Sequence, residues 1–471
     1  MFTTKMYIER RRRCAVEVTI KPLQDRKYLP SYVNERTIDF GNKQLVQQDK
    51  QLNLFTGMGK KGITIEDVRY LGGNIRKEID RYDFVTVNID FNQLAGPCTE
   101  LSKGEVVTSF IEGWHLAGYQ FLKYKQAERK VEPQLSWEGE ELADLVEKGV
   151  IRANAVNVAR DLCNEPANKL TPTIYAKRLV ELFEQTSVEV TIIDTENLRQ
   201  HGFEATAIVG KGSSNPAKVA ILTYKNSPDA PTALVGKGVT FDSGGTNVKT
   251  GHDIGEMKMD MGGSAAVVGA VKMLSDLQAA VHVVAVIPLV TNVAGANAFL
   301  PSDVITYRNG LTVEVGNTDA EGRLILADGI LYAKSIGANK IIDIATLTGT
   351  IGQALGLKVA GIFTNNEQSM WKYKQLGERT GDYVWPMPLI NDYYHYLKSN
   401  TADINNMSSS MFGGAITAAL FLQKFIDADI EWIHIDMANT VRPWKEEGYY
   451  VAGASGFGVR LLNEIVKDLA I

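Results

Sequence analysis

The stretch Asn317-Thr-Asp-Ala-Glu-Gly-Arg-Leu324 places two carboxylates, two residues apart, and an arginine on one short segment. Apolar residues recur after it at steps of three and four, at Leu324, Ala327 and Leu331. This spacing predicts a helix over 321–336 that begins among Asp319, Glu321 and Arg323. Residues two apart point away from each other inside a helix, so the two acids can share a cation only where the helix joins a loop. An acidic helix cap is the alternative explanation for this stretch taken alone.

A second, glycine-rich segment carries further charged residues. It reads Val235-Gly-Lys-Gly-Val-Thr-Phe-Asp-Ser-Gly-Gly-Thr-Asn-Val-Lys249, and Glu256-Met-Lys-Met-Asp-Met-Gly-Gly263 follows it. Glycine has no Cβ, so the backbone of such turns can approach a small ion or ligand closely. We expect four charged residues of these turns to join the acids of the first stretch: Lys237, Asp242, Lys249 and Asp260.

Four acids and two lysines are typical of a site for a pair of divalent cations. Bridging carboxylates hold such ions about 3.5–4 Å apart, and the pair activates water while it polarises a carbonyl group. A lysine can act as a ligand only as a neutral amine, which requires adjacent cations to lower its pKa. One lysine as a ligand and the other as a charged electrophile is a consistent division. The six histidines show no HExxH or similar paired spacing.

Over about residues 135–471 the chain resembles the cytosolic leucyl aminopeptidases, the M17 group of dinuclear metallopeptidases. The resemblance rests on NTDAEGRL together with VGKG-x-TFDSGG, and on three further segments: Ala159-Arg-Asp-Leu-Cys-Asn-Glu-Pro-Ala-Asn168, Ala345-Thr-Leu-Thr-Gly349 and Gly414-Ala-Ile-Thr-Ala-Ala419. It implies a metal-dependent aminopeptidase that hydrolyses the N-terminal residue, preferably leucine or another apolar one, from peptides with a free N-terminus.

The resemblance also implies a role for each charged residue. Five would bind the two metal ions: Lys237, Asp242, Asp260, Asp319 and Glu321. Asp242 and Glu321 would bridge the ions, and a hydroxide between the ions would attack the peptide. Lys249 would polarise the scissile carbonyl, and Arg323 would hold a bicarbonate ion that acts as general base. The metals would be zinc or manganese, with magnesium or cobalt as alternatives, and the usual order of affinities favours zinc.

Six more residues would bind the substrate by the same resemblance: Met257, Thr346, Leu347, Gly349, Ala438 and Val441. The set is largely apolar and suits a leucine or methionine side chain. Val441 stands where the family usually has methionine, and the shorter side chain would enlarge the pocket. Ordinary core packing is the alternative explanation for each of these residues.

Composition indicates an ordinary globular enzyme, with 45% hydrophobic and 22% charged residues among 471. No apolar stretch approaches 18 residues and the N-terminus lacks the apolar segment of a signal peptide, so we expect a cytoplasmic protein without a membrane partner. Three widely spaced cysteines, Cys14, Cys98 and Cys163, argue against a disulfide framework and a thiolate zinc site. Nothing beside Cys163 supplies a base, which argues against a nucleophilic role.

Charge and pattern divide the chain into two α/β domains, each a mixed sheet flanked by helices. Residues 1–137 contain 22 lysines and arginines against 17 acids, whereas the remainder contains 28 against 38. We expect an N-terminal, macro-like α/β domain at 1–137, a connecting helix at 138–162 and the catalytic domain at 163–471, an α/β sandwich with ligands at the carboxyl ends of its strands.

The expected elements follow from the apolar patterns. In the N-terminal part we expect a strand over 84–90 and a helix over 104–121, and a long helix then runs from Trp137 to Leu162. In the catalytic part we expect helices over 173–185, 263–277, 321–336 and 414–425 and strands over 188–193, 281–287, 340–345 and 432–437.

Other functions remain open at this point. The run Arg10-Arg-Arg-Arg13 and the basic excess of residues 1–137 suggest a nucleic-acid-binding accessory protein of the same fold, as some family members bind DNA; an excess of five charges is small, and a solvated surface explains it better. A cysteinylglycine-type dipeptidase and a catalytically inactive relative are further alternatives. All seven charged positions carry the expected residue type, which argues against the inactive relative. The resemblance implies a homohexamer.

Overall fold

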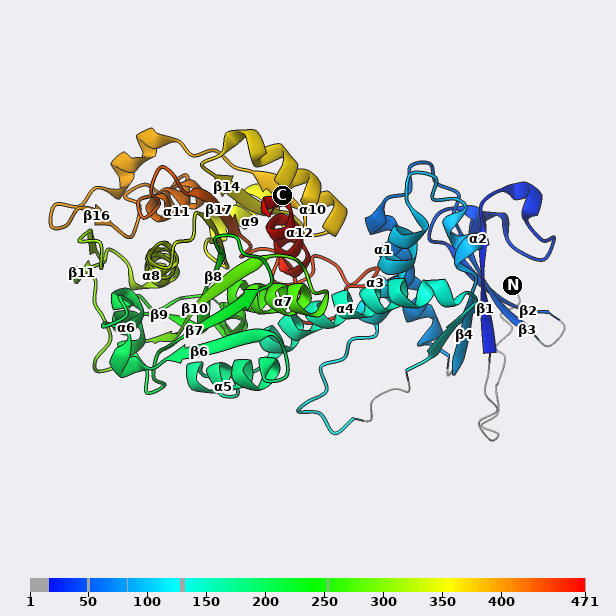
Figure 1. Ribbon diagram of the computed structural model, residues 1–471, viewed down its shortest axis with the longest axis horizontal. Helices are drawn as coiled ribbons and strands as arrows, with labels where there is room; N and C mark the ends of the chain where they lie inside the picture. The colour runs from blue at the N-terminus through cyan, green and yellow to red at the C-terminus, as the bar shows by residue number, and fades with distance from the viewer. Residues whose placement is uncertain (1–16, 49–50, 83, 128–131, 252–253, 471) are drawn as a thin grey trace. The chain divides into compact units, whose positions relative to one another are not determined.

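The computed structural model describes residues 17–48, 51–82, 84–127, 132–251 and 254–470 (Figure 1). The run Arg10–Arg13 and Cys14 lie outside these ranges. The chain divides into two compact units, Met1–Gly149 and Val150–Ile471. The boundary falls within helix α4 (Ala143–Asn164), so this one helix contributes residues to both units. The finer division at 137 and 162 stays a prediction.

The first unit contains a five-stranded mixed sheet in the order β2-β3-β1-β4-β5. Its strands are β1 (Glu17–Leu23), β2 (Lys43–Gln48), β3 (Gln51–Gly57), β4 (Thr86–Ile89) and β5 (Gln134–Trp137). Its helices are α1 (Ile65–Ile79), α2 (Phe91–Ala95) and α3 (Lys103–Ala117). Gly72 of α1 lies against the Phe110 carbonyl of α3, and Gly113 of α3 lies against the Arg69 carbonyl, so glycine lets the two helices approach closely.

The start of the long helix differs from the prediction. Trp137 was expected to begin it, but Trp137 ends strand β5, where it pairs with Ile89 of β4. Gly139 then adopts a left-handed backbone with φ of 99°, and a short 3-10 turn over Glu140–Leu142 precedes α4. The left-handed residue separates strand from helix, a change of direction that the apolar periodicity does not reveal.

The second unit contains a nine-stranded mixed sheet in the order β15-β14-β17-β13-β8-β10-β7-β6, with β9 beside β10. Its strands are β6 (Val188–Ile193), β7 (Lys218–Lys225), β8 (Thr232–Gly236), β9 (Gly238–Gly245), β10 (His282–Val293), β13 (Lys340–Ala345), β14 (Ala360–Thr364), β15 (Val384–Pro386) and β17 (Glu431–Asp436). The central strands β17, β13, β8 and β10 run parallel to one another. Helices cover both faces of the sheet, which explains why the sequences of these central strands are nearly continuously apolar.

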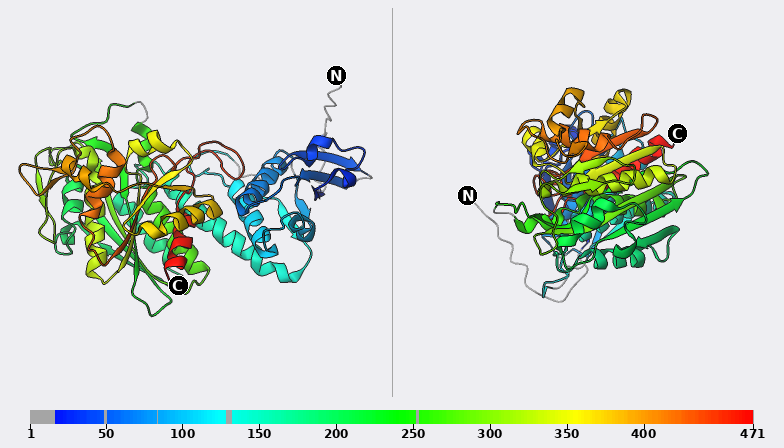
Figure 2. Two further views of the ribbon diagram at one scale, coloured as in Figure 1. Left: turned by 90° about the horizontal axis from the view of Figure 1, so that it is seen from above. Right: turned by 90° about the vertical axis from the view of Figure 1, so that its left-hand side faces the viewer.

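The helices of this unit form two layers around the sheet (Figure 2). One layer holds α6 (Glu204–Val209), α8 (Glu321–Ser335) and α11 (Gly414–Gln423). The other holds α5 (Pro172–Phe183), α7 (Gly262–Asp276), α10 (Met370–Thr380) and α12 (Val459–Leu469). Helix α9 (Gly349–Leu355) follows β13. This arrangement confirms the predicted α/β sandwich. No helix in the described ranges is both long and apolar enough to cross a membrane.

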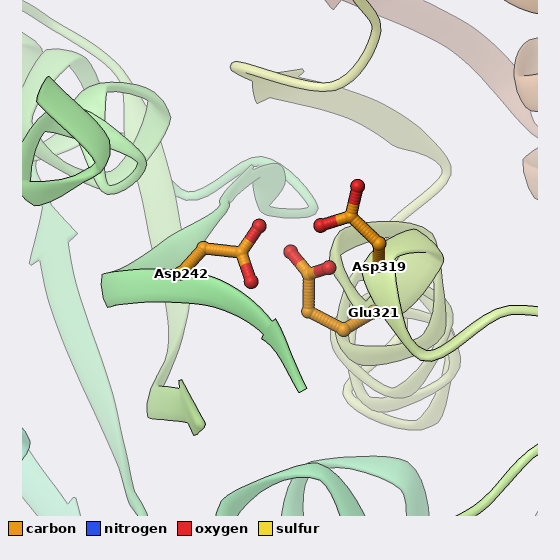
Figure 3. A group of neighbouring side chains, drawn as sticks. All are labelled: Asp242, Asp319 and Glu321. Atoms are coloured by element: carbon orange, nitrogen blue, oxygen red, sulfur yellow. The ribbon is translucent and has the colours of Figure 1, made fainter. Parts of the chain in front are cut away.

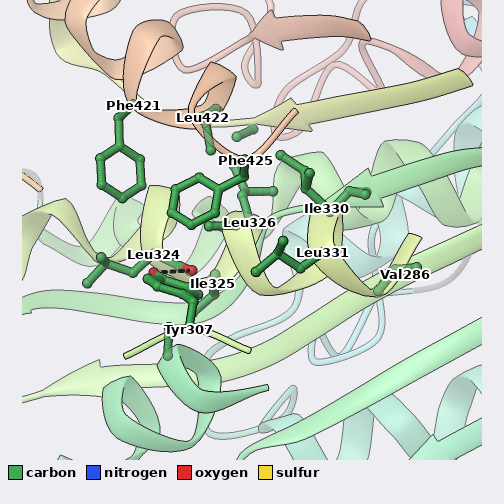
Figure 4. Close-up of a cluster of buried hydrophobic side chains, with 14 of the residues drawn as sticks. Val286, Tyr307, Leu324, Ile325, Leu326, Ile330, Leu331, Phe421, Leu422 and Phe425 are labelled. Atoms are coloured by element: carbon green, nitrogen blue, oxygen red, sulfur yellow. Dashed lines mark hydrogen bonds between the residues drawn. The ribbon is translucent and has the colours of Figure 1, made fainter. Parts of the chain in front are cut away.

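Helix α8 packs into an extensive apolar core of the second unit (Figure 4). The buried residues drawn there from α8 are Leu324, Ile325, Leu326, Ile330 and Leu331. They meet α11 and β10, and the Tyr307 hydroxyl donates to the Leu324 carbonyl at 3.0 Å. Truncating one such leucine to alanine costs about 2–5 kcal/mol. This packing fixes the N-terminus of α8, where the acidic stretch begins.

A small three-stranded sheet, β11-β12-β16, includes the last strand before that N-terminus, β12. Its strands are β11 (Val304–Thr306), β12 (Thr312–Glu314) and β16 (Ile404–Asn405). The parallel pair β12 and β16 brings residue 406 to the loop that follows β12. Two segments about 90 residues apart in the sequence therefore meet beside Asn317.

Candidate metal centre

The charged residues of the glycine-rich segment lie on strand β9 and on the segments that border β8 and β9. Lys237 follows β8, but Asp242 lies within strand β9 rather than in a turn. β9 pairs with β10 in a parallel register that shifts twice, and Gly244 and Gly245 have φ of 90° and 65°. Register shifts and left-handed glycines are features of a bulged strand, so the glycines that suggested a turn belong to an irregular strand.

The acids of the first stretch lie where a 3-10 turn joins a helix. The turn covers Thr318–Ala320, and α8 begins at Glu321. The Asn317 side chain caps the turn by accepting a hydrogen bond from the Asp319 amide at 2.7 Å. Ala320 occupies the N-cap position of α8 and makes no side-chain cap. Neither Asp319 nor Glu321 is therefore used as a helix cap, and both are available for another partner.

Three carboxylates converge here (Figure 3). Asp242, Asp319 and Glu321 each offer one oxygen atom, and these atoms lie within 4.8 Å of one another. Lys249 Nζ lies 2.8 Å from Asp242 Oδ2 and 2.5 Å from Asp319 Oδ1. The structure thus joins residues from β9, from the loop after it and from the start of α8.

Lys237 and Asp260 complete the group. Lys237 Nζ lies 2.7 Å from Asp260 Oδ1 and 3.1 Å from Glu321 Oε1, and it donates to the Thr346 carbonyl at 2.9 Å. Burial alone would lower the pKa of Lys237, but the acids Asp260, Glu321 and Asp242 raise it above its ordinary value. Each lysine is therefore an ammonium group between two acids.

The two lysines do not neutralise the four acids completely. Burial, with the charges of Asp242 and Asp260, raises the pKa of Glu321 to about 8. Burial also raises the pKa of Asp260 to about 6. Asp260 Oδ2 and Glu321 Oε2 are buried and accept no hydrogen bond from any described residue. Buried carboxylate oxygens without a partner are costly, so the site favours added positive charge, and the donor set fits divalent cations.

Arg323 is buried in the first turn of α8. Its Nη1 donates to the Asn406 carbonyl at 2.8 Å, and its buried Nε lacks an acceptor within the described part of the chain. Burial lowers the pKa of Arg323 to about 10, and the charge of Glu321 acts in the opposite direction. A guanidinium with unused donors is suited to bind a small planar anion.

The structure places most of the predicted substrate-binding residues around the same strand ends. A Cβ atom on Gly262 would lie 2.8 Å from Val441 Cγ2 and 3.3 Å from Thr346 Cγ2, so these two side chains flank the start of α7. The amides of Leu347 and Ala438 both donate to Asp436 Oδ1, at 3.2 and 3.3 Å.

Two other predicted residues lie on the segments that border this group. Met257 precedes Asp260 in a 3-10 turn, and its carbonyl accepts from the Asp260 amide at 3.3 Å. Gly349 begins α9, and the space that a Cβ atom would take there is open. Cys163 is buried, which raises its pKa to about 12, so its thiol is poorly suited to act as a nucleophile.

Two asparagines that the sequence analysis did not identify contact the site. Asn292 of β10 donates to Asp242 Oδ1, and the Asn406 side chain accepts from the Gly316 amide at 2.8 Å and donates to the Asn317 carbonyl at 2.8 Å. A signal existed for Asn292, because it is a polar residue at the end of the apolar strand HVVAVIPLVTNV. Asn406 lies in a polar loop and gives no such signal.

Comparison with known proteins identifies the family. Residues 157–463 match the catalytic domain of the cytosol aminopeptidase family. The chain belongs to this family. A probable cytosol aminopeptidase of Chlorobium limicola is 38% identical over 431 residues, which cover 87% of this chain and 85% of the relative. Another, of Aquifex aeolicus, is 38% identical over 422 residues, covering 88% and 84%. Membership confirms the resemblance and implies a metal-dependent aminopeptidase, a hydrolase that acts on peptides.

Solved structures of the same kind agree with this assignment. The bottromycin maturation enzyme BotP matches with a TM-score of 0.89 and 30% identity over 97% of this chain and 100% of its own. A second structure of BotP, in complex with Mn, matches with a TM-score of 0.88. The cluster of three carboxylates in the present chain likewise fits divalent metal ions.

Proposed function

We propose that this chain is a two-metal aminopeptidase that removes leucine or another apolar residue from the N-terminus of peptides. The observation that carries the proposal is the convergence of Asp242, Asp319 and Glu321, with oxygen atoms within 4.8 Å of one another, beside two lysines. A solvated acidic surface would not leave buried carboxylate oxygens unpaired.

Five residues would hold the metal ions: Lys237, Asp242, Asp260, Asp319 and Glu321. When bound, two divalent cations would polarise the scissile carbonyl and lower the pKa of a water molecule. Carboxylate and amine ligands fit zinc or manganese, with magnesium or cobalt as alternatives. A ligand role for Lys237 requires the neutral amine. The acidic neighbours raise the pKa of Lys237, whereas adjacent dications would lower it and so favour the neutral form.

Lys249 is suited to act on the substrate carbonyl. Its side chain is 25% exposed, whereas that of Lys237 is only 4% exposed. Burial alone would lower the pKa of Lys249, but Asp242 and Asp319 raise it, so the ammonium stays charged. A charged donor at the edge of the site would stabilise the negative charge that develops on the carbonyl oxygen during attack.

Arg323 is proposed to bind a bicarbonate ion, which would supply a general base. The guanidinium lies near Glu321, and its buried Nε has no acceptor among the described residues. Specificity for leucine is proposed from the apolar surroundings of Thr346 and Val441 beside Gly262. The larger pocket expected from Val441 would also admit methionine.

One assay tests the proposal. Metal-stripped protein is incubated with each of zinc, manganese, magnesium and cobalt, and hydrolysis of leucine p-nitroanilide is compared with that of its N-acetyl analogue. We expect activity only after metal addition and only on the free amine, because the amino group is needed to hold the substrate at the ions. Hydrolysis of the acetylated analogue at a similar rate, or activity without metal, would overturn the mechanism.

We also propose a cytoplasmic homohexamer, because family resemblance implies this assembly. Light scattering of the purified protein measures it directly, and a stable monomer at micromolar concentration would contradict it.

A further inference from the structure

Asn292 lies between the two segments that carry the carboxylates. It is fully buried near the end of β10, where it pairs in register with Asp242 of β9. Its Nδ2 donates to Asp242 Oδ1 at 2.8 Å and to the Thr318 carbonyl at 3.0 Å. One amide group therefore joins β9 to the turn that carries Asp319.

The direction of these bonds is fixed by the partners. A carboxylate oxygen and a carbonyl oxygen can only accept, so the nitrogen of Asn292 must face both, and its two hydrogens are fully used. Its Oδ1 is buried and has no donor within the described ranges, and it lies where a Cβ atom on Gly245 would approach to 2.8 Å. An unpaired buried acceptor destabilises a protein by about 1–3 kcal/mol, which offsets part of the stabilisation from the two donated bonds.

The contacts of Asp242 show what Asn292 does. Asp242 Oδ1 accepts from the Gly244 amide at 2.9 Å as well as from Asn292, so both of its lone pairs are occupied. Asp242 Oδ2 instead points to Lys249 Nζ, on the side of the other carboxylates. Asn292 thus holds one oxygen and leaves the other directed into the site.

We propose that Asn292 is a positioning residue that sets the orientation of Asp242 and the distance between Asp242 and the Asp319 turn before a metal ion binds. This inference rests on the proposed two-metal function. Outer hydrogen-bond partners of metal ligands contribute about 10–100-fold to metal affinity, because they hold the ligand in its binding geometry. Removing the two donors of Asn292 should weaken metal affinity by a factor in that range.

The test is calorimetric titration of Mn²⁺ and of Zn²⁺ into the metal-stripped, full-length protein. Asn292→Ala removes the donors and leaves a void, whereas Asn292→Leu removes the donors and keeps the branched shape. Asn365→Ala is the matched control, because Asn365 also joins two segments, donating to the Ile430 carbonyl at 2.7 Å and accepting from the Trp432 amide at 2.9 Å, at the opposite end of β17 from the site.

We expect both Asn292 variants to keep the wild-type circular dichroism spectrum and to bind each ion about 10–100-fold more weakly, while the control binds as wild type does. Wild-type affinity in a folded Asn292 variant would overturn the inference. So would failure of both variants to fold, because Asn292 would then support the sheet and not the ligands. A wild-type protein that binds neither ion would instead overturn the proposed function.

Discussion

Asp328 provides a test of the packing between two helices, and its effect depends on pH. It lies fully buried on α8, and its Oδ2 accepts from the Thr206 amide at 2.7 Å and the Thr206 hydroxyl at 2.8 Å. Thr206 lies in the first turn of α6, whose N-cap residue Phe203 makes no side-chain bond. Asp328 therefore satisfies an amide that the short helix α6 leaves unpaired.

Burial raises the pKa of Asp328 to about 7, and the hydrogen bonds from Thr206 only partly oppose this. An acid whose pKa is raised by folding contributes most to stability below its unfolded pKa, and the contribution is lost as the pH rises through the folded pKa. Stability falls as the pH rises from 5 to the folded pKa of about 7 and is then constant up to pH 8. These two pH units correspond to a loss of about 3 kcal/mol in the free energy of unfolding.

Asp328→Asn should abolish this dependence. The asparagine oxygen still accepts from Thr206, but its amide hydrogens gain no acceptor, which costs about 1–3 kcal/mol. The variant should therefore be less stable than wild type at pH 5 and should match or exceed it at pH 8. Urea unfolding of both proteins at the two pH values, at one metal concentration, measures the difference.

A matched control separates burial from hydrogen bonding. Asp403 accepts from the Thr312 amide and hydroxyl, both at 2.8 Å, in the same pattern, but it is exposed and these bonds lower its pKa. Asp403→Asn should change stability equally at pH 5 and pH 8, because a lowered pKa titrates below this window. If the difference between wild type and Asp328→Asn stays constant from pH 5 to pH 8, the reasoning is refuted.

Three further predictions concern the site. Lys249→Ala should lower kcat by about 10²–10³-fold while metal content, measured by elemental analysis, stays at the wild-type level; loss of metal would place Lys249 among the ligands. Arg323→Ala should leave a residual activity that no longer responds to added bicarbonate, and persistent stimulation would contradict its role. Val441→Met should narrow the pocket and lower kcat/KM for phenylalanine p-nitroanilide more than for the leucine compound; an equal effect on both would remove Val441 from the pocket.

Local patterns in the sequence were sufficient for much of the fold. The apolar periodicity after Asn317 predicted a helix over 321–336, and the structure has α8 at Glu321–Ser335. The strands expected over 188–193 and 340–345 are β6 and β13 with the same bounds. These elements were predictable because each buries a regular apolar face.

Strand β9 was not predicted, because the apolar alternation in its sequence GVTFDSGG is limited to Val239 and Phe241, and its pairing with β10 is decided by contacts distant in sequence. The same reason explains why Asn406 was missed. Its hydrogen bonds reach residues 86 to 90 positions away, and only the pairing of β12 with β16 brings them together. Sequence spacing locates charged residues within a motif, but not the polar partners that reach the motif from elsewhere.

The structure also separates the two lysines, which spacing alone could not do. Lys237 pairs with Asp260 and Glu321 in the buried part of the site, whereas Lys249 pairs with Asp242 and Asp319 and stays partly exposed. A lysine that acts as a metal ligand has to be enclosed with the ions, because only close dications can stabilise its neutral amine. A lysine that stabilises charge on a substrate has to be reachable from solvent. The difference in burial therefore supports Lys237 as the ligand and Lys249 as the electrophile.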